Sequence, residues 1–435
     1  MAVKTVKEIA YLAKQASLKL AHLSTEVKDR ALIQMAEALE NYVTVVLNAN
    51  AKDLEFADKE NISGPLKARL ALNEDKVLSM AKGIRSVAQL ADPVNQKQSL
   101  MELDKGLVLH RLSCPIGVIG AIFESRPDAV PQISSLCLKS GNSVILKGGT
   151  EAQNSNKTIV SLLVEAVRNI PEIPEGTIQI IETRLEVAEM LEEDTNINLI
   201  VPRGSNEFVK FIQENTKIPV LGHSEGICHC YIDREADFQK AVRIVLDSKT
   251  QYPAACNAIE TLLIHKDIAG QILPVLIERF EAGGVELLGC GKTREVVSGM
   301  KPAVNEDWDT EYTDLKLSVK IVSSEQEAID FINTHGSGHT DSIITENKER
   351  AGLFLNEVDS ASVMCNASTR FADGFRYGLG AEIGISTNKT HARGPVGLDG
   401  LVIYKYRLIG NGQIVADYTG KNGKAFTHIP FPLEK

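Results

Sequence analysis

The sequence predicts an α/β protein built on doubly wound parallel sheets. After a helical N-terminal region, short apolar runs that favour β-strands alternate with helical stretches, first over residues 115–222 and again after Cys228. This alternation is typical of parallel sheets with helices on both faces. Because such sheets bind ligands in the turns at the carboxyl ends of their strands, we expect the functional residues in those turns.

The composition narrows the class of protein. A length of 435 residues predicts two or three domains, and a net charge of −10 argues against nucleic acid as a partner. We expect no signal peptide, because the N-terminal residues 1–8 lack an apolar core, and no membrane span, because no apolar run reaches about 18 residues. Seven scattered cysteines indicate reduced thiols, so we expect a cytoplasmic protein. The pair Cys228 and Cys230 lacks the second pair of a zinc motif, and we expect no metal.

The elements follow from periodicity and turn signals. Apolar residues at helical spacing predict helices over residues 4–92, with a break at 61–65. An exposed strand is expected at 106–114, and buried strands at 116–123, 143–147, 178–182, 198–202 and 218–222. Helices are expected between them at 150–170, 183–192 and 206–216. In the second region we expect helices at 238–247 and 268–282, strands at 259–264 and 315–322, and a capping box at 324–327. Residues 401–408 alternate as a second exposed strand.

Cys256 is the strongest candidate for chemistry. It follows the turn Gln251-Tyr-Pro-Ala-Ala and precedes the apolar run 259–264. A thiol among small neighbours at the start of a strand is accessible, and cysteine is intrinsically very nucleophilic at neutral pH. The alternative is a small buried residue without a chemical role.

Three basic segments lie in the turns where ligands are expected. There is no G-x-G-x-x-G fingerprint, but Lys147-Gly148-Gly149 follows a strand and suits a ribose or phosphate. Arg203-Gly204-Ser205 precedes a helix, and Arg126 ends a buried strand, where its guanidinium could bind a carboxylate or phosphate. The alternatives are a surface lysine, a plain helix cap and a structural salt bridge.

Two histidines occur close together in a glycine-rich segment, His335-Gly-Ser-Gly-His339. Their spacing suggests a metal site, but the two glycines argue against the helix that would bring both rings to one face. We therefore prefer a substrate loop.

Taken together, these segments resemble the γ-glutamyl phosphate reductases (glutamate-5-semialdehyde dehydrogenases), a branch of the aldehyde dehydrogenase superfamily. The resemblance extends over nearly the whole chain. It rests on residues 115–127, 141–149, 201–205, 222–229, 256–263, 335–341, 371–387 and 391–398.

The resemblance implies a reaction and a set of residues. The family reduces L-glutamyl 5-phosphate with NADPH to glutamate 5-semialdehyde and phosphate, in proline biosynthesis. Cys256 matches the family's nucleophile, which forms a thioester. The implied cofactor-binding residues are Lys147, Gly148, Gly149, Gly204, Ser205 and Glu311. The implied substrate-binding residues are Ser125, Arg126, Asn257 and His339.

Two departures from other aldehyde dehydrogenases fit this reaction. Hydrolytic members use a glutamate in an E-L-G-G motif to activate water, whereas this sequence has His223-Ser-Glu225-Gly226, with the acid offset. Their ribose-binding glutamate, three residues after the lysine, is Thr150 here, with Glu151 one further on. Losing that carboxylate removes repulsion against a 2′-phosphate and favours NADPH.

The resemblance also implies the domains. We expect an NADPH-binding domain from residues 1–105 and 115–228, a catalytic domain from 229–395, and oligomerisation strands in 106–114 and 396–420. A homo-oligomer is expected, and contact with glutamate 5-kinase is possible in this family. Two other functions stay open: a hydrolytic aldehyde dehydrogenase, which would not need phosphate, and a silent relative kept for binding.

Overall fold

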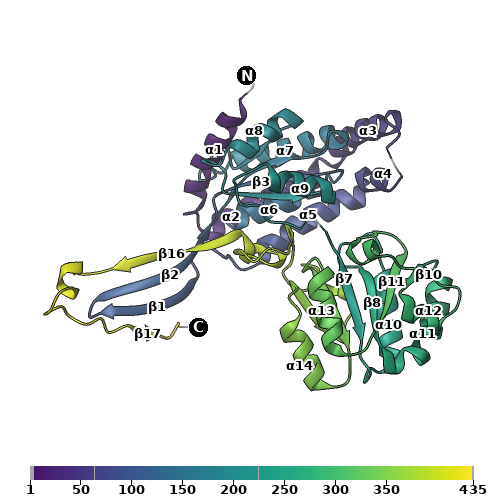
Figure 1. The fold of residues 1–435 in the computed structure, drawn as a ribbon. Coiled ribbons are helices and arrows are strands. Elements are labelled where there is room, and N and C mark those ends of the chain that lie inside the picture. Colours follow the sequence, from purple (N-terminus) through teal and green to yellow (C-terminus); the bar gives the residue numbers. More distant parts are fainter. Residues whose placement is uncertain (1–3, 63, 224, 434–435) are drawn as a thin grey trace.

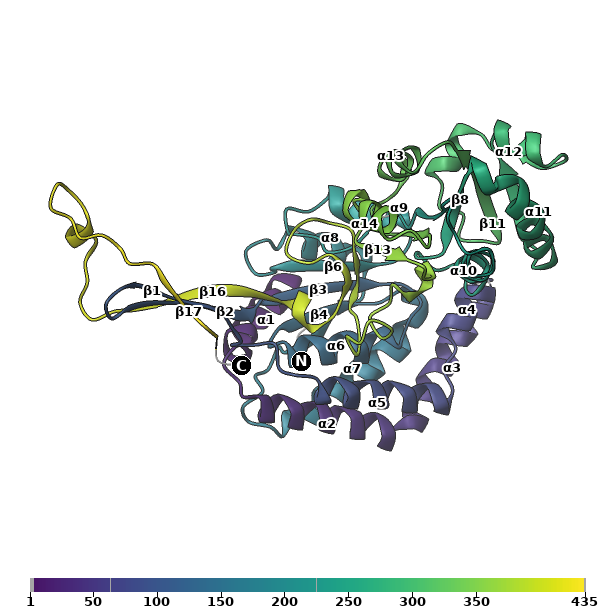
Figure 2. The same ribbon diagram turned by 90° about the horizontal axis from the view of Figure 1, so that it is seen from below.

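The computed structural model describes residues 4–62, 64–223 and 225–433, and it has three parts. An N-terminal α/β unit and a second α/β unit lie next to each other, and a long antiparallel arm projects away from both (Figures 1 and 2). The predicted α/β class with parallel sheets is confirmed. Among the described helices, none is long and apolar enough to cross a membrane.

The N-terminal region is helical, as predicted. Thr5 and Glu8 form a capping box at the start of the first helix, and the Asn73 side chain caps the fifth. The five helices are α1 (Val6–Leu20), α2 (Thr25–Asn41), α3 (Val43–Lys59), α4 (Gly64–Leu70) and α5 (Glu74–Gln89).

The sheet of the first unit is parallel, with the strand order β5-β4-β3-β6. Its strands are β3 (Val118–Phe123), β4 (Ser143–Lys147), β5 (Ile178–Ile180) and β6 (Leu199–Arg203). Its connecting helices are α6 (Ala129–Lys139), α7 (Gln153–Arg168), α8 (Arg184–Glu192) and α9 (Asn206–Glu214). The expected strand at 218–222 is reduced to a single parallel bridge between Val220 and Ile200.

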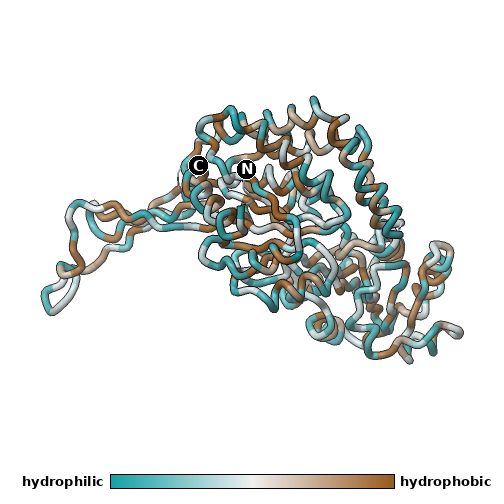
Figure 3. Tube along the Cα trace, turned by 90° about the horizontal axis from the view of Figure 1, so that it is seen from above, coloured by the Kyte–Doolittle hydropathy of each residue, from teal (hydrophilic) through white to brown (hydrophobic). Residues whose placement is uncertain are grey.

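Both faces of this sheet are buried, which explains its continuous apolar runs. Ile119 and Ala121 face the core formed with α2, α5, α6 and α7. Val118 and Ile122, which point the other way, face the core formed with α1, α8 and α9. Hydrophobic residues accordingly run along the strands inside the unit (Figure 3).

The second unit contains a seven-stranded parallel sheet, with the order β10-β9-β11-β8-β7-β12-β13. Its strands are β7 (Cys228–Ile232), β8 (Ile259–His265), β9 (Glu286–Gly289), β10 (Lys301–Pro302), β11 (Lys316–Val322), β12 (Thr340–Ile344) and β13 (Ser362–Cys365). Its helices are α10 (Phe238–Thr250), α11 (Lys266–Ala282), α12 (Gly291–Val296), α13 (Glu325–His335) and α14 (Lys348–Glu357). Ser324 caps α13 as predicted, although Glu327 accepts from the Ser323 N–H and not from that of Ser324.

The arm is an antiparallel sheet with the order β16-β2-β1-β17. Its strands are β1 (Lys97–Asp104), β2 (Leu107–Pro115), β16 (Val402–Ile409) and β17 (Ile429–Phe431). The two predicted strands are therefore confirmed as β2 and β16; β16 is largely exposed, as predicted, whereas β2 lies between β1 and β16 and is buried or half-buried. The arm includes residues 97–104, which the expected domain boundaries had placed in the cofactor domain. A tight turn at Gly106, with φ of +74°, folds β1 back onto β2 instead.

The segment before β16 also differs from the expected boundary at residue 395. It contains β14 (Gly384–Ser386) and β15 (Gly394–Val396), and it returns to the first unit. Ile383, Val396, Leu398 and Leu401 join the core of that unit because it offers them an apolar surface. Short 3₁₀ turns occur at Thr150–Ala152, Asn305–Asp309, Thr369–Phe371, Leu398–Leu401 and Val415–Tyr418.

Candidate active site

Cys256 lies in the loop between α10 and β8, and its side chain is half-buried. Two neighbours fix the loop. The Asn257 Nδ2 atom donates to the Ala372 carbonyl at 2.8 Å, and the Cys228 thiol donates to the Cys256 carbonyl at 3.2 Å. Asn257, expected to bind substrate, is thus tied to the segment that returns to the first unit, and its buried Oδ1 has no hydrogen-bond partner among the residues that the structure describes.

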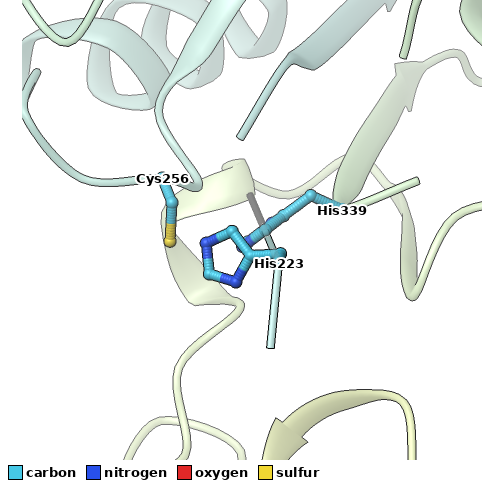
Figure 4. A group of neighbouring side chains, drawn as sticks. All are labelled: His223, Cys256 and His339. Carbon is cyan, nitrogen blue, oxygen red and sulfur yellow. The ribbon is translucent and has the colours of Figure 1, made fainter. Parts of the chain in front are cut away.

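Two imidazoles face the thiol. Ligand atoms of His223, Cys256 and His339 all lie within 4.8 Å of one another, and the His223 ring turns its edge toward the sulfur (Figure 4). The two rings pack edge-on, with centroids 4.7 Å apart. His223 follows the last segment of the first unit, whereas His339 directly precedes β12. The chain therefore brings residues from both units to one thiol.

The tautomer of His223 is fixed by its partner. Its Nδ1 lies 2.9 Å from the Ile385 carbonyl oxygen, which can only accept, so Nδ1 carries the hydrogen and Nε2 is a free acceptor. Burial lowers the pKa of His223, an effect that Arg203 reinforces and that the Ile385 bond, Glu311 and Glu382 oppose. The imidazole is consequently neutral at neutral pH.

His339 is almost fully buried. Its Nδ1 lies 2.8 Å from the Thr340 hydroxyl oxygen and 3.7 Å from the Cys228 sulfur, and its Nε2 has no partner among the described atoms. The structure thus places this sequence-predicted residue beside Cys256.

Two arginines lie close enough to Cys256 for their charges to interact with it. Burial lowers the pKa of Arg203, the nearby Arg126 lowers it further, and Glu382 and Cys256 oppose both effects. Arg370 behaves similarly: burial lowers its pKa, and the negative charge available at Cys256 raises it. The thiolate is the nucleophilic form of cysteine, and it would carry its negative charge beside these two guanidinium groups. Arg126 and the segment Arg203-Gly204-Ser205 were singled out from the sequence, whereas Arg370, one residue before a matched segment, was missed.

Ser125 has a strained backbone, with φ of +40°. Its N–H and its hydroxyl both donate to Glu151, at 2.7 and 2.6 Å. These bonds hold the Glu151 carboxylate over the Gly149 main chain. The predicted substrate contact of Ser125 stays a prediction.

The lysine and glycines expected to bind cofactor lie at the carboxyl end of β4. Burial lowers the pKa of Lys147; Arg184 also lowers it, whereas Glu151 and Glu124 raise it. Arg184 begins α8, just beyond the neighbouring strand β5, so two cations share this edge of the sheet. Arg184 was not identified from the sequence, because only the folded sheet brings it close to Lys147.

Gly204, Ser205 and Glu311 come together at the start of α9. Asn206 Nδ2 donates to the Glu311 carboxylate at 2.9 Å, which links the second unit to this helix. The Ser205 N–H donates to Glu124 at 3.1 Å, and a Cβ on Gly204 would lie 2.7 Å from that carboxylate. The helix N-terminus therefore holds an anion in a space that only glycine leaves open.

The two sequence motifs considered as metal ligands, Cys228 with Cys230 and His335 with His339, do not form shared sites in the structure. Cys228 and Cys230 lie on one strand with a residue between, and His229 bonds to Asp341 at 2.9 Å. His335 instead contacts Asp309, at 2.7 Å, and does not join His339.

Comparison with known proteins agrees with this site. The model of the aldehyde dehydrogenase family matches residues 1–295. A γ-glutamyl phosphate reductase of Acetivibrio thermocellus is 54% identical over 424 residues, covering 98% of each chain. That of Methanosarcina mazei is 55% identical over 431 residues, covering 97% of this chain and 96% of its own.

Solved structures give the same result. The γ-glutamyl phosphate reductase of Thermotoga maritima superposes with a TM-score of 0.92 at 42% identity, covering 94% of this chain and 100% of its own. An acetylating aldehyde dehydrogenase of Geobacillus thermoglucosidasius shares the fold, with a TM-score of 0.66 at 17% identity, covering 94% of this chain and 97% of its own. This chain is therefore an oxidoreductase of the aldehyde dehydrogenase family and belongs to its γ-glutamyl phosphate reductase branch.

Proposed function

We propose that this protein reduces L-glutamyl 5-phosphate to L-glutamate 5-semialdehyde and phosphate, with NADPH, through a thioester on Cys256. The observation that carries the proposal is a half-buried thiol bordered by a neutral imidazole and by arginines. The relatives named above are reductases of this acyl phosphate, and their similarity covers nearly the whole chain.

The surroundings of Cys256 suit an anionic acyl phosphate. Attack of the thiolate on the acyl carbon forms a thioester and releases phosphate, which is a good leaving group. Arg126 and Arg203 are the cations that would bind the substrate's phosphate or α-carboxylate, because guanidinium groups pair with both. Glu225, the acid offset from the hydrolytic position, is exposed, and among the described residues 223, 225 and 226 only His223 belongs to the group around the Cys256 thiol.

The residues at the coenzyme edge fit a phosphorylated nicotinamide dinucleotide. Lys147 and Arg184 would hold a 2′-phosphate, the start of α9 with Gly204 and Ser205 would hold the pyrophosphate, and Glu311 would contact the nicotinamide ribose. The Glu151 carboxylate is held in place by Ser125, and the charges of Lys147 and Arg184 would offset its repulsion of a 2′-phosphate. When bound, the coenzyme supplies the hydride that reduces the thioester.

The arm suits a homo-oligomer. β16 is an edge strand of its sheet, and it exposes Tyr406, Leu408 and Ile409. An exposed apolar edge of this kind is a ready surface for a second chain. We propose that two copies associate through it.

One assay tests the activity. Glutamate 5-semialdehyde and NADP⁺ are supplied with and without phosphate, and NADPH absorbance is followed. The proposal expects NADPH formation only with phosphate; formation without phosphate would indicate a hydrolytic aldehyde dehydrogenase, and none in either case would reject both. Cys256→Ala should abolish turnover but keep NADPH binding, whereas the control Cys365→Ala, on β13, should keep both.

A further inference from the structure

We propose that His223 is a catalytic residue, the group that removes the proton from the Cys256 thiol and passes it to the departing phosphate. This inference rests on the proposed function for the identity of the leaving group. It assigns a role to a residue that the sequence did not single out, and it supplies the proton transfers that a thiol nucleophile requires.

One hydrogen bond and the position of the ring suit His223 to this role. The Ile385 carbonyl accepts from Nδ1 and so leaves the lone pair of Nε2 free. The edge of the ring is turned toward the sulfur (Figure 4), and the ligand atoms of His223 and Cys256 lie within 4.8 Å. A base whose other nitrogen is held by a third group is the arrangement that activates cysteine and serine nucleophiles.

The charged groups around His223 keep it in its basic form. Arg203 disfavours a proton on the ring, and Glu311 and Glu382 favour one, but burial outweighs the carboxylates, so the pKa lies below the ordinary value. His339 packs its ring against His223, and the Cys256 thiol completes the surroundings. A neutral imidazole beside a thiol can accept its proton, whereas an imidazolium cannot.

The proton balance closes over one turnover. His223 Nε2 takes the proton of the thiol, and the thiolate forms the C–S bond while the C–O bond to phosphate breaks with its electron pair on oxygen. The imidazolium then gives its proton to that oxygen and returns to neutral. The bound coenzyme would supply the hydride that converts the thioester carbonyl to an alkoxide. As that C=O bond re-forms, the C–S bond breaks with its electron pair on sulfur, aldehyde is released, and the thiolate regains a proton from solvent through His223. Each turnover therefore consumes one proton.

The test measures the thiol directly and needs no substrate. Alkylation of Cys256 by iodoacetamide is followed by mass spectrometry of its peptide, in the wild type and in His223→Ala. We expect the variant to react at least tenfold more slowly at pH 7, and the difference to vanish near pH ~9–10, where a thiol ionises without help. The matched control, His335→Ala, changes a histidine that contacts Asp309 outside the site and should react like the wild type.

Turnover supplies the second measurement. Loss of a general base typically lowers kcat by about 10²–10⁴, and added imidazole should restore part of the rate in His223→Ala, because the small ring can enter the space left by the side chain. His223→Gln, which fills the space without a base, should lose activity and should not respond to imidazole. Circular dichroism and NADPH titration show whether both variants are folded.

Three results would overturn the proposal. The first is a rate of Cys256 alkylation at pH 7 in His223→Ala that equals the wild-type rate. The second is a kcat of His223→Ala within twofold of the wild type. The third is a loss of kcat in folded His223→Ala that imidazole does not restore. If the wild type lacked reductase activity, the alkylation comparison would still decide whether His223 activates Cys256, so the two proposals fail separately.

Discussion

The main chain of Gly226 lies directly against the main chain of Cys256. A Cβ on Gly226 would come within 2.2 Å of the Cys256 carbonyl oxygen and 2.7 Å of its Cα, and backbone atoms cannot move aside as a flexible side chain can. The position of the thiol thus depends on a residue 30 positions earlier that has no side chain.

Gly226→Ala should therefore displace Cys256. We expect kcat to fall by at least tenfold, because small misplacement of a nucleophile strongly reduces its rate, while the affinity for NADPH stays within twofold. Steady-state kinetics and fluorescence titration measure the two effects. Gly270→Ala is the control: it lies in α11 with nothing within 4 Å of its Cβ, and alanine there should stabilise the helix by ~1 kcal/mol. Unchanged kcat in Gly226→Ala would show that the loop tolerates the displacement.

Arg184 should determine the choice of coenzyme. Arg184→Ala removes one of the two cations at the end of β4, so we expect KM for NADPH to rise by about tenfold, the loss of one charge-assisted contact. KM for NADH should change by less than twofold, because NADH has no 2′-phosphate. Arg168→Ala, at the exposed end of α7, is the matched control. Equal changes for both coenzymes would contradict the assignment.

Asp233 should make the stability of the second unit depend on pH. Burial raises the pKa of its carboxyl, but bonds from the Thr345 hydroxyl, the Glu235 N–H and Arg350 outweigh burial and lower it overall. A lowered folded-state pKa gives stability that is present above the unfolded value of ~3.9 and is lost as the pH falls through the folded value. Asp233→Asn should cost ~3 kcal/mol at pH 7, because it removes the buried carboxylate and leaves Arg350 only its longer contact with Glu235, at 3.4 Å.

Urea unfolding checks this sign. The difference between wild type and Asp233→Asn should be constant from pH 7 to ~5 and should narrow below pH ~3.9. Asp58→Asn, on an exposed side chain, should shift the free energy of unfolding by no more than ~0.5 kcal/mol. A difference that widens with acid would refute the assignment.

Leu408→Glu should weaken association. The substitution places a charge on the exposed face of β16, so light scattering after size exclusion should show a smaller species at equal concentration. Leu18→Glu, at an equally exposed site on α1, should not change the mass. If Leu408→Glu kept the wild-type mass, the interface would lie elsewhere.

Periodicity and turn signals were sufficient for most elements, because the buried strands β3, β4, β6 and β8 are continuous apolar runs with clear stops. They were insufficient where pairing is long-range. β1 is polar and half-exposed, and only its hairpin with β2 places it on the arm. β17 has three residues and is defined only by its partner β1.

The residues of the site likewise divide into those that a local sequence pattern predicts and those whose role depends on neighbours distant in sequence. Cys256 and Lys147 stand in local patterns that carry chemical meaning by themselves. His223 does not, because its importance comes from Ile385, 162 residues later, whose carbonyl fixes the tautomer. Arg184 and Arg370 likewise gain their roles from neighbours that are distant in sequence.

The two edge strands of the arm, β16 and β17, differ in their capacity to pair with another strand. On one side, β16 is eight residues long, and every second residue turns its N–H and C=O groups to the unpaired side; on the other, β17 is three residues long and contains Pro430, which cannot donate. A sheet in which only one edge strand can pair with another chain is extended once, and the resulting sheet has no second open edge for a further copy. Such an arm would favour a closed pair over a fibre, and the last strand of the chain acts as the terminator.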